Sequence, residues 1–444
     1  MNDMTANFVL GNGKLNEIAL ADFIIEKHTI VTCHGIMRNA DGILDESLIK
    51  KYIAEKLKTL GYNSGTIQKV ESVFKLCKVR SAVDKIVTEE NQIPLKNGTI
   101  TVDLKTGAMD FEPIKYPSPY RLNVSLNKEK PKSDRREPNR FFEWLDIFDP
   151  SDIDCFQEIM GYLLLPTTRG QKSFFLLGNG REGKSVWGSI LYMMFGNAFT
   201  PVKVYELEDN RFTIATIEGK LIAYDDDMNH EKLKKTDNFK ALVTAKTPQQ
   251  GERKGQDKFE FLPYARICAC GNFLPSSLYD TSDGYFRRLL PIRVRNRPAD
   301  RKDISDFEKP IADELEEILL WSLTGLKRLI KNDFQFSISK RSEELLQSIK
   351  EESNTILDFI DEKITFDAKS SISSSDLYRA YQMYCERNGG IVRSRNSFLS
   401  YFKEHDEILG ISYNKHLPGD KRGFSGMTIR QINLDEMIGG NQGE

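Results

Sequence analysis

The fold class that the sequence predicts is α/β, and three apolar segments in the middle of the chain are the reason. The first, 173–177, leads directly into a glycine-rich loop, and a helical stretch over 186–195 follows that loop. The other two, 220–224 and 265–270, each end in polar residues. Short apolar strands that alternate with loops and helices are typical of an α/β domain with its functional groups at the strand ends.

Eight consecutive residues form the glycine-rich loop: Gly178, Asn179, Gly180, Arg181, Glu182, Gly183, Lys184 and Ser185. They match the pattern G-x-x-x-x-G-K-S, whose backbone N–H groups can point at a polyphosphate. Lys184 supplies a positive charge for the β- and γ-phosphates, and Ser185 offers a hydroxyl ligand to Mg²⁺. A turn that matches by chance is the alternative, but the flanking strand and helix favour binding of a nucleoside triphosphate.

The composition indicates a globular protein of two or three domains without a global charge bias. Of the 444 residues, 39% are hydrophobic, and 63 Lys and Arg residues stand against 65 Asp and Glu residues, so any basic surface must be local. The six cysteines show no disulfide framework, and Cys268 and Cys270 lack a second pair that would complete a zinc site. With no membrane-spanning run and no signal segment, we expect a cytoplasmic protein without a membrane partner.

We expect three domains: an N-terminal α/β domain with a linker over 1–140, a nucleotide-binding domain over 141–335, and a C-terminal domain over 350–435. In the N-terminal domain, the spacing of apolar residues predicts a helix over 46–60. The alternating segment 97–107 predicts a short strand between turns.

The segments around the nucleotide-binding domain are predicted to be polar or helical. Residues 123–140 are charged and contain proline, which is typical of a solvated linker, with a DNA contact as the alternative. Apolar residues at helical spacing predict helices over 141–165 and 304–329, and a polar helical connector over 339–350.

The second apolar strand ends in three carboxylates, Asp225, Asp226 and Asp227. One carboxylate there can hold the Mg²⁺ shell, and an adjacent one can orient or deprotonate an attacking water. A surface acidic turn is the alternative, but the position after an apolar strand downstream of Lys184 favours a catalytic role. The sequence does not decide which two of the three aspartates act.

Two further elements can complete a site for phosphoryl transfer. Asn272 follows the third apolar strand, where its amide can bind the γ-phosphate or the water; a turn residue is the alternative. Arg287 and Arg288 precede an apolar segment, and an arginine that reaches the γ-phosphate of a neighbouring subunit stabilises the transferred charge. An ordinary surface pair is the alternative for the arginines.

Two basic elements are candidate DNA contacts. Lys254 lies at the tip of a predicted hairpin that also carries Lys258, and a basic tip can grip a phosphate backbone without reading bases; a solvated turn is the alternative. The C-terminal domain is predicted as helices over 376–387 and 394–404 followed by strands. Its local excess of basic residues suits a winged helix on duplex DNA, with a protein-docking winged helix as the alternative. The basic candidates there are Arg393, Arg395, Lys421 and Arg422.

In their order along the chain, these elements resemble a superfamily III helicase, and within it the phage and plasmid primase-helicase family that includes poxvirus relatives. The resemblance covers about 95–430 and is most specific over 173–292. Besides the phosphate loop, the acidic strand end and the Lys254 hairpin, it is carried by Cys270-Gly271-Asn272-Phe273-Leu274-Pro275 and Gly284-Tyr285-Phe286-Arg287-Arg288. We find no carboxylate set for nucleotide polymerisation, so we do not expect primase activity.

The resemblance implies an AAA+-like P-loop ATPase core that assembles as a homo-hexameric ring. It implies that ATP is hydrolysed between subunits and that the ring moves 3′ to 5′ on single-stranded DNA. Lys184 would bind phosphate, and Ser185 and Asp226 would hold the Mg²⁺ that arrives with the nucleotide. The remaining implied roles are those of the preferred acidic pair Asp226 and Asp227, the sensor Asn272, the arginine finger Arg288 and the DNA-tracking Lys254.

The function implied is that of a replicative DNA helicase and replication initiator of a phage, plasmid or mobile element. Its partners would be single-stranded and duplex origin DNA, together with host replication proteins. Two other functions stay open: a P-loop ATPase that loads or remodels at an origin without processive unwinding, and an ATP-stabilised origin-binding protein.

Overall fold

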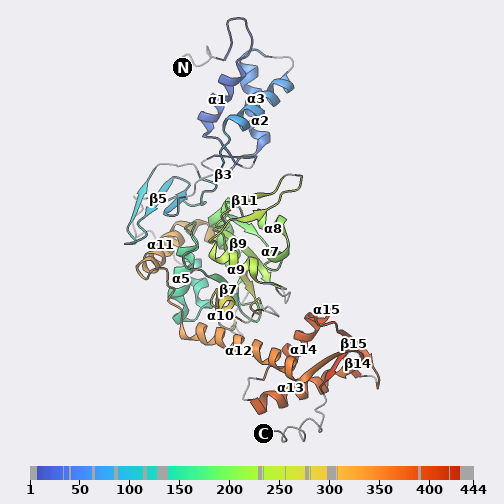
Figure 1. The fold of residues 1–444 in the computed structure, drawn as a ribbon. Helices are drawn as coiled ribbons and strands as arrows, with labels where there is room; N and C mark the ends of the chain where they lie inside the picture. The colour runs from blue at the N-terminus through green and yellow to red at the C-terminus, as the bar shows by residue number, and fades with distance from the viewer. Residues whose placement is uncertain are drawn as a thin grey trace, which may run out of the picture. The chain divides into compact units, whose positions relative to one another are not determined.

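The computed structural model describes residues 8–33, 35–39, 42–62, 66–84, 89–113, 118–127, 139–228, 233, 235–255, 257–275, 280, 282–297, 307, 309–388, 392–419 and 421–430. The chain divides into two compact units, and Figure 1 shows its helices and strands. The first unit comprises Met1–Met228, Asn238–Asn272 and Ile292–Ser339. The second comprises Asn229–Asp237, Phe273–Pro291 and Lys340–Glu444.

A five-stranded sheet has the order β13-β7-β12-β9-β8; its strands β7, β12, β9 and β8 belong to the first unit, and β13 crosses from the second unit into the first at Ile292. Its strands are β7 Ser173–Leu177, β8 Phe199–Pro201, β9 Ile222–Met228, β12 Arg266–Gly271 and β13 Leu289–Arg293. Strand β12 pairs in parallel with β7 on one side and with β9 on the other, so that Gly271 lies opposite both Leu177 and Met228. The segments that follow these three strands therefore leave the same edge of the sheet. This parallel sheet confirms the predicted α/β class.

Helices cover the sheet because their apolar faces need a partner. Helix α6 (Ser185–Phe195) begins where the glycine-rich loop ends and packs on β8 and β9. Helix α5 (Ile153–Tyr162) packs along α11 (Leu315–Lys331). Glycines permit this close approach, since a Cβ atom at Gly161 would collide with the backbone of α11 and one at Gly325 with that of α5.

The predicted helix over 141–165 is interrupted. It divides into α4 (Arg140–Trp144), η1 (Leu145–Ile147), η2 (Pro150–Asp152) and α5. Proline at the first position of a helix has no N–H to donate and restricts the residue before it, which explains a new helical start at Pro150. Within the described residues, the helix predicted over 304–329 is likewise divided, into the short helix η4 (Pro310–Glu314), which begins at a proline, and α11 (Leu315–Lys331).

Shorter elements complete this part of the chain. They are η3 Gly196–Ala198, α7 Glu206–Asp209, α8 Arg211–Thr216, α9 Asp237–Thr244, and the antiparallel strands β10 Gln249–Gly251 and β11 Phe259–Phe261. Strands β10 and β11 form a hairpin with Lys254 and Gly255 in its turn, as predicted.

The N-terminal part of the first unit combines three helices with two small antiparallel sheets. Its elements are α1 Glu17–His28, β1 Val31–Cys33, β2 Ile36–Asn39, β3 Gly42–Ile43, α2 Glu46–Thr59, α3 Thr66–Arg80, β4 Gln92–Leu95, β5 Gly98–Val102 and β6 Met109–Glu112. The predicted helix and strand correspond to α2 and β5, and Asp45 caps α2 by accepting from Ser47 N. Most of the predicted linker, 128–138, lies outside the described residues.

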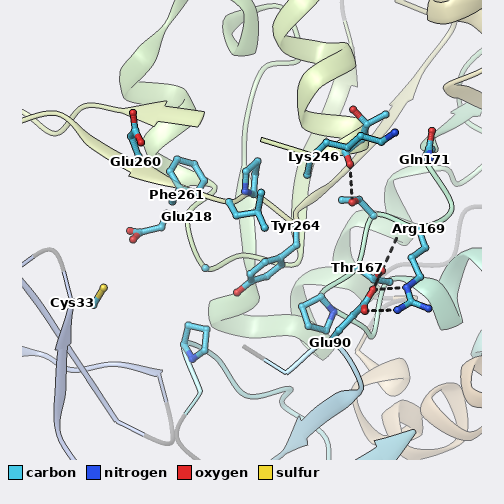
Figure 2. A pocket seen from close by; sticks show the side chains of 18 of the residues that line it. Cys33, Glu90, Thr167, Arg169, Gln171, Glu218, Lys246, Glu260, Phe261 and Tyr264 are labelled. Atoms are coloured by element: carbon cyan, nitrogen blue, oxygen red, sulfur yellow. Dashed lines mark hydrogen bonds and ion pairs between the residues drawn. The ribbon is translucent and has the colours of Figure 1, made fainter. Parts of the chain in front are cut away.

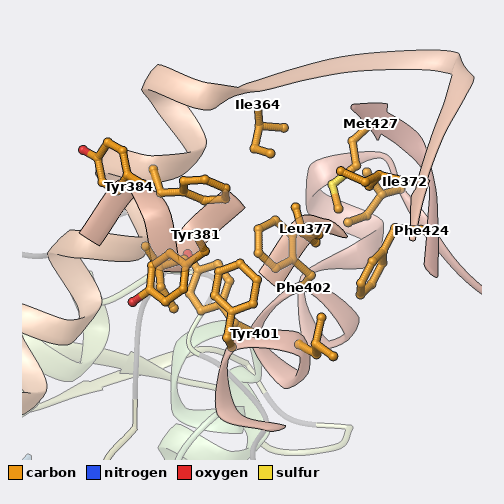
Figure 3. Close-up of a cluster of buried hydrophobic side chains, with 14 of the residues drawn as sticks. Ile364, Ile372, Leu377, Tyr381, Tyr384, Tyr401, Phe402, Phe424 and Met427 are labelled. Carbon is orange, nitrogen blue, oxygen red and sulfur yellow. The ribbon is translucent and has the colours of Figure 1, made fainter. Parts of the chain in front are cut away.

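The second unit has its own hydrophobic core, drawn in Figure 3. Strands β14 (Ile364–Ser373), β16 (Lys421–Ile429) and β15 (Ser412–Leu417) form an antiparallel sheet in that order. The helices are α10 Asp283–Phe286, α12 Lys340–Lys363, α13 Ser374–Asn388, α14 Arg395–Glu404 and α15 Asp406–Leu409. Phe398 of α14 stacks on Tyr381 of α13 with ring centroids 4.2 Å apart, which fixes these two helices against each other.

Helix α12 differs from the predicted short connector over 339–350. It is one continuous helix of 24 residues, and Ile356 and Phe359 in its second half are fully buried in the core of the second unit. The predicted boundary at 350 therefore falls inside a helix.

Candidate functional site

The glycine-rich loop connects β7 to α6 and has a backbone that few other residues would permit. Gly180 and Gly183 have φ angles of +114° and +98°, in the region that side chains rarely adopt. Gly178 N donates to Gly271 O at 3.1 Å, which ties the start of the loop to the end of β12. The loop thus begins at the edge where the three parallel strands end.

Within the loop, Glu182 folds back onto the backbone of its own chain. Its carboxylate accepts from Gly180 N at 2.8 Å, from Asn179 N, and from Lys184 Nζ at 2.8 Å. Burial raises the pKa of Glu182, but the hydrogen bonds from Lys184 and from backbone N–H groups outweigh it and leave the pKa below its ordinary value. Glu182 is therefore a buried, ionised carboxylate at neutral pH.

The three aspartates of β9 lie in different environments. Asp225 is buried and accepts from Lys203 Nζ at 2.8 Å and from Val204 N at 3.0 Å. This pairing raises the pKa of Lys203, chiefly through the hydrogen bond to Asp225. Asp226 and Asp227 are exposed. Asp225 thus ties β9 to the segment after β8, whereas the next two carboxylates face solvent.

A chain of polar contacts joins the loop to β12 and β9. Cys270 Sγ lies 3.5 Å from Lys184 O and 3.2 Å from the hydroxyl oxygen of Tyr224, which in turn donates to Asp226 Oδ1 at 3.2 Å. Burial raises the pKa of Tyr224 far above its ordinary range and raises that of Cys270 to about 12, so both groups keep their protons. Gly188 of α6 makes room for this tyrosine, since a Cβ atom there would collide with its ring.

Sequence reasoning missed Tyr224 and Cys270 as parts of the site. Their signal was present but weak, since Tyr224 directly precedes the acidic residues and Cys270 directly precedes Gly271. The apolar segment 265–270 corresponds to β12, in which Cys268 and Cys270 are both buried. Among the described residues, no group of three or more His, Cys, Asp or Glu side chains is placed to hold a metal ion by itself.

The structure brings some of the candidate residues together. The loop follows β7, Asp226 and Asp227 lie at the end of β9, and the exposed Asn272 directly follows β12, so all belong to one edge of the sheet. Arg287 and Arg288 belong to the second unit, after the short helix α10. Arg287 is exposed, whereas Arg288 is half-buried and donates to Gly284 O.

The candidate DNA contacts are mostly exposed. Lys254 and Lys258 lie on the hairpin of β10 and β11. Arg253 beside them pairs with Glu218 and lies 4.0 Å over the ring of Phe259, which holds the hairpin together where its strands meet the turn.

In the second unit, Arg395 is exposed at the start of α14 and donates to Ser375 Oγ at 3.2 Å. Lys421 and Arg422 are exposed at the start of β16. Arg393 is half-buried, and its carbonyl accepts from Tyr378 Oη at 2.8 Å.

A separate cavity of about 730 Å³ lies in the first unit, away from the loop (Figure 2). Glu90 and Arg169 face each other in it and form two hydrogen bonds of 2.8 Å, with Thr167 donating to the same carboxylate. Arg38 pairs with Glu218 at 3.5 Å. Both arginines that line the cavity are thus already matched by carboxylates. Its lining comes from segments far apart in the sequence, so no local pattern could have indicated it.

Two family models match parts of the chain. Residues 176–288 match a family described as one of unknown function, DUF5906. Residues 351–418 match the family described as poxvirus D5 protein-like, which relates much of the second unit to those proteins. No curated protein matches the chain. Within the described residues, no helix is both long and apolar enough to cross a bilayer.

Among solved structures, three structures of the C-terminal region of NrS-1 match the chain at 12% identity. They cover 92%, 93% and 94% of this chain and 99% to 100% of their own. The TM-scores are 0.45, 0.45 and 0.46.

Proposed function

We propose that the protein is an ATP-dependent DNA helicase that acts in the replication of a phage, plasmid or mobile element. One observation carries the proposal: a glycine-rich loop after β7, two exposed carboxylates at the end of β9 and an exposed amide after β12 lie at one edge of the sheet, where three adjacent parallel strands end. Phosphoryl transfer to water needs these three parts: the loop cradles the phosphates, the carboxylates form an acidic pair, and the amide is a polar group near the γ-phosphate. The poxvirus D5-like match over 351–418 supports a replication role.

In this proposal the residues of the loop and of β9 divide the work. Lys184 binds the β- and γ-phosphates, and the backbone N–H groups of the loop hold their oxygens. Asp227 orients the attacking water, with Asp226 beside it. Ser185 and Asp226, both exposed at this edge, are the residues that would hold the Mg²⁺ of a bound nucleotide. When bound, that ion would neutralise charge on the phosphates.

We further propose that the core is AAA+-like and works as a homo-hexameric ring that moves 3′ to 5′ on single-stranded DNA. Arg288 of one subunit would then stabilise the γ-phosphate held by the next, as the family resemblance implies. Asn272 would sense the γ-phosphate, and Lys254 at the hairpin tip would hold the DNA backbone.

For the second unit we propose a winged helix that binds duplex DNA. Helices α13 and α14 beside the three-stranded sheet of β14, β16 and β15 suit this arrangement. Arg395, Lys421 and Arg422 are exposed there and would contact phosphates.

The test is unwinding of forked DNA by the full chain with ATP and Mg²⁺, with substrates that carry only a 3′ or only a 5′ tail. We expect unwinding of the 3′-tailed fork and none by Lys184→Ala, while Lys331→Ala, an exposed lysine of α11, unwinds like wild type. DNA-stimulated ATP hydrolysis without strand separation would favour a loader or remodeller instead. Binding of origin DNA with negligible hydrolysis would favour an ATP-stabilised origin-binding protein.

A further inference from the structure

The phosphate loop already holds an anion, and that anion belongs to the protein. The carboxylate of Glu182 accepts from two backbone N–H groups of the loop and from Lys184. These are the donor types that a phosphate-binding loop offers to phosphate oxygens. Glu182 and Lys184 are both largely withdrawn from solvent, with side chains 3% and 11% exposed.

The position of the carboxylate is inside the loop. A Cβ atom built on Gly178 would lie 2.9 Å from both Glu182 Cδ and Lys184 Nζ, so the two side chains fold back over the loop's first residue. Gly180 N has both carboxylate oxygens within reach, at 2.8 Å and 2.9 Å. A phosphate group that used Gly180 N and Lys184 would need the space and the donors that Glu182 occupies.

We propose that Glu182 is an internal competitor of the polyphosphate ligand, which closes the loop in the empty protein and must swing out before a nucleotide binds. This inference rests on the proposed nucleotide binding by the loop. The physical basis is competition between anions for one set of donors. A phosphate chain carries more negative charge and more acceptor oxygens than one carboxylate, so it can displace Glu182 at a cost in affinity.

The competition has a signature in two measurements that other roles of Glu182 do not share. If the carboxylate stabilises the empty loop, its removal lowers the melting temperature of the ligand-free protein. If it also blocks the site, the same removal strengthens binding of the phosphate ligand, because the competent state is populated more often. If Glu182 had only a structural role, its removal would lower the melting temperature and also weaken binding of the phosphate ligand. If Glu182 contacted the nucleotide, its removal would weaken binding.

The experiment measures binding of a fluorescent ADP analogue and of inorganic phosphate to the full chain, together with thermal unfolding with and without each ligand. The variants are Glu182→Gln, which keeps the shape, and Glu182→Ala, which removes the group altogether. Glu386→Gln, an exposed glutamate of α13, is the matched control. We expect about tenfold tighter ADP binding for both Glu182 variants, a lower melting temperature without ligand, and no change in the control.

The outcomes separate this inference from the proposed function. Wild type that binds ADP, with folded Glu182 variants that bind no more tightly, would overturn the competitor role and leave nucleotide binding intact. Failure of wild type and of both variants to bind ADP would overturn nucleotide binding by the loop. Binding by the variants alone would support both, since it would mean that Glu182 keeps the loop closed under the conditions used.

Discussion

The hydroxyl group of Tyr224 donates to Oδ1 of Asp226 at 3.2 Å, and the hydroxyl oxygen of Tyr224 also lies 3.2 Å from Cys270 Sγ. This contact holds one carboxylate oxygen of an otherwise exposed aspartate in a fixed direction. Because the tyrosine ring is buried against α6 and β12, the orientation of Asp226 depends on packing beneath the sheet edge. Tyr224 is therefore a positioning residue in the proposed mechanism.

We expect Tyr224→Phe to lower kcat for ATP hydrolysis about tenfold and to leave KM for ATP near the wild-type value. A hydrogen bond to a charged group contributes about 1.5 kcal/mol or more, and here it acts on a carboxylate rather than on the bound nucleotide. Steady-state ATPase kinetics measure both constants. Tyr192→Phe on α6, where the side chain is 64% exposed, is the control and should change neither. A rise in KM with unchanged kcat would contradict the positioning role.

The three aspartates of β9 should separate into two classes. Asp225→Asn removes the charged partner of Lys203, and the Lys203 side chain is 41% exposed. Because solvent screens such a pair, we expect the free energy of unfolding to fall by only about 1 kcal/mol and the melting temperature by about 3 °C. Asp226→Asn and Asp227→Asn leave this pair intact and should abolish most hydrolysis at an unchanged melting temperature. Thermal unfolding and ATPase rates for the three variants test the division. Full stability in Asp225→Asn would argue against its structural role.

This division shows where sequence reasoning ends. The run Asp225 to Asp227 was identified from its place after an apolar strand, which is local information. Which carboxylate is buried depends on Lys203 and Val204, which reach Asp225 from the segment after β8. No pattern within the run encodes that contact.

The other sequence predictions of secondary structure also succeeded where their signals are local and failed where they depend on contacts between distant segments. The strand, loop and helix around Lys184 and the hairpin at Lys254 were predictable because their signals are short-range. The sequence predicts only a connector over 339–350 because these first turns of α12 are polar. The second half of the helix was missed because the burial of Ile356 and Phe359 arises from packing in the second unit. The roles of Arg287 and Arg288 stay predictions.

Arg288→Ala should keep nucleotide binding and lose about 1,000-fold in turnover, because an arginine finger acts on the phosphate of the neighbouring subunit. Mixing this variant with Lys184→Ala tests catalysis between subunits, since some interfaces then combine an intact loop with an intact arginine. We expect partial recovery of ATPase activity over a range of mixing ratios. Arg287→Ala is the control for the choice of arginine. If no ratio restores hydrolysis, action on a neighbouring subunit is unsupported.

Lys254→Ala should spare ATP hydrolysis without DNA and reduce unwinding severely. Lys254 is exposed in the turn of a hairpin whose turn end is held by the contact between Arg253 and Phe259, so loss of the lysine side chain should leave the hairpin folded. ATPase rates with and without single-stranded DNA, together with fork unwinding, measure the effect. Lys331→Ala serves as the control. An equal loss of DNA-free hydrolysis would mean that the turn supports the ATPase core instead.

The double variant Lys421→Glu and Arg422→Glu should weaken duplex DNA binding through lost phosphate contacts. Each phosphate contact releases counterions, so two lost contacts should reduce the slope of log Kd against log salt by about 2. Fluorescence anisotropy on duplex DNA at several salt concentrations measures the slope. The control is Lys105→Glu with Lys331→Glu, which changes the net charge equally at exposed positions of the first unit. An equal change in both double variants would show that overall charge, and not the second unit, governs duplex binding. A reduced slope in the first alone would place the phosphate contacts at the start of β16.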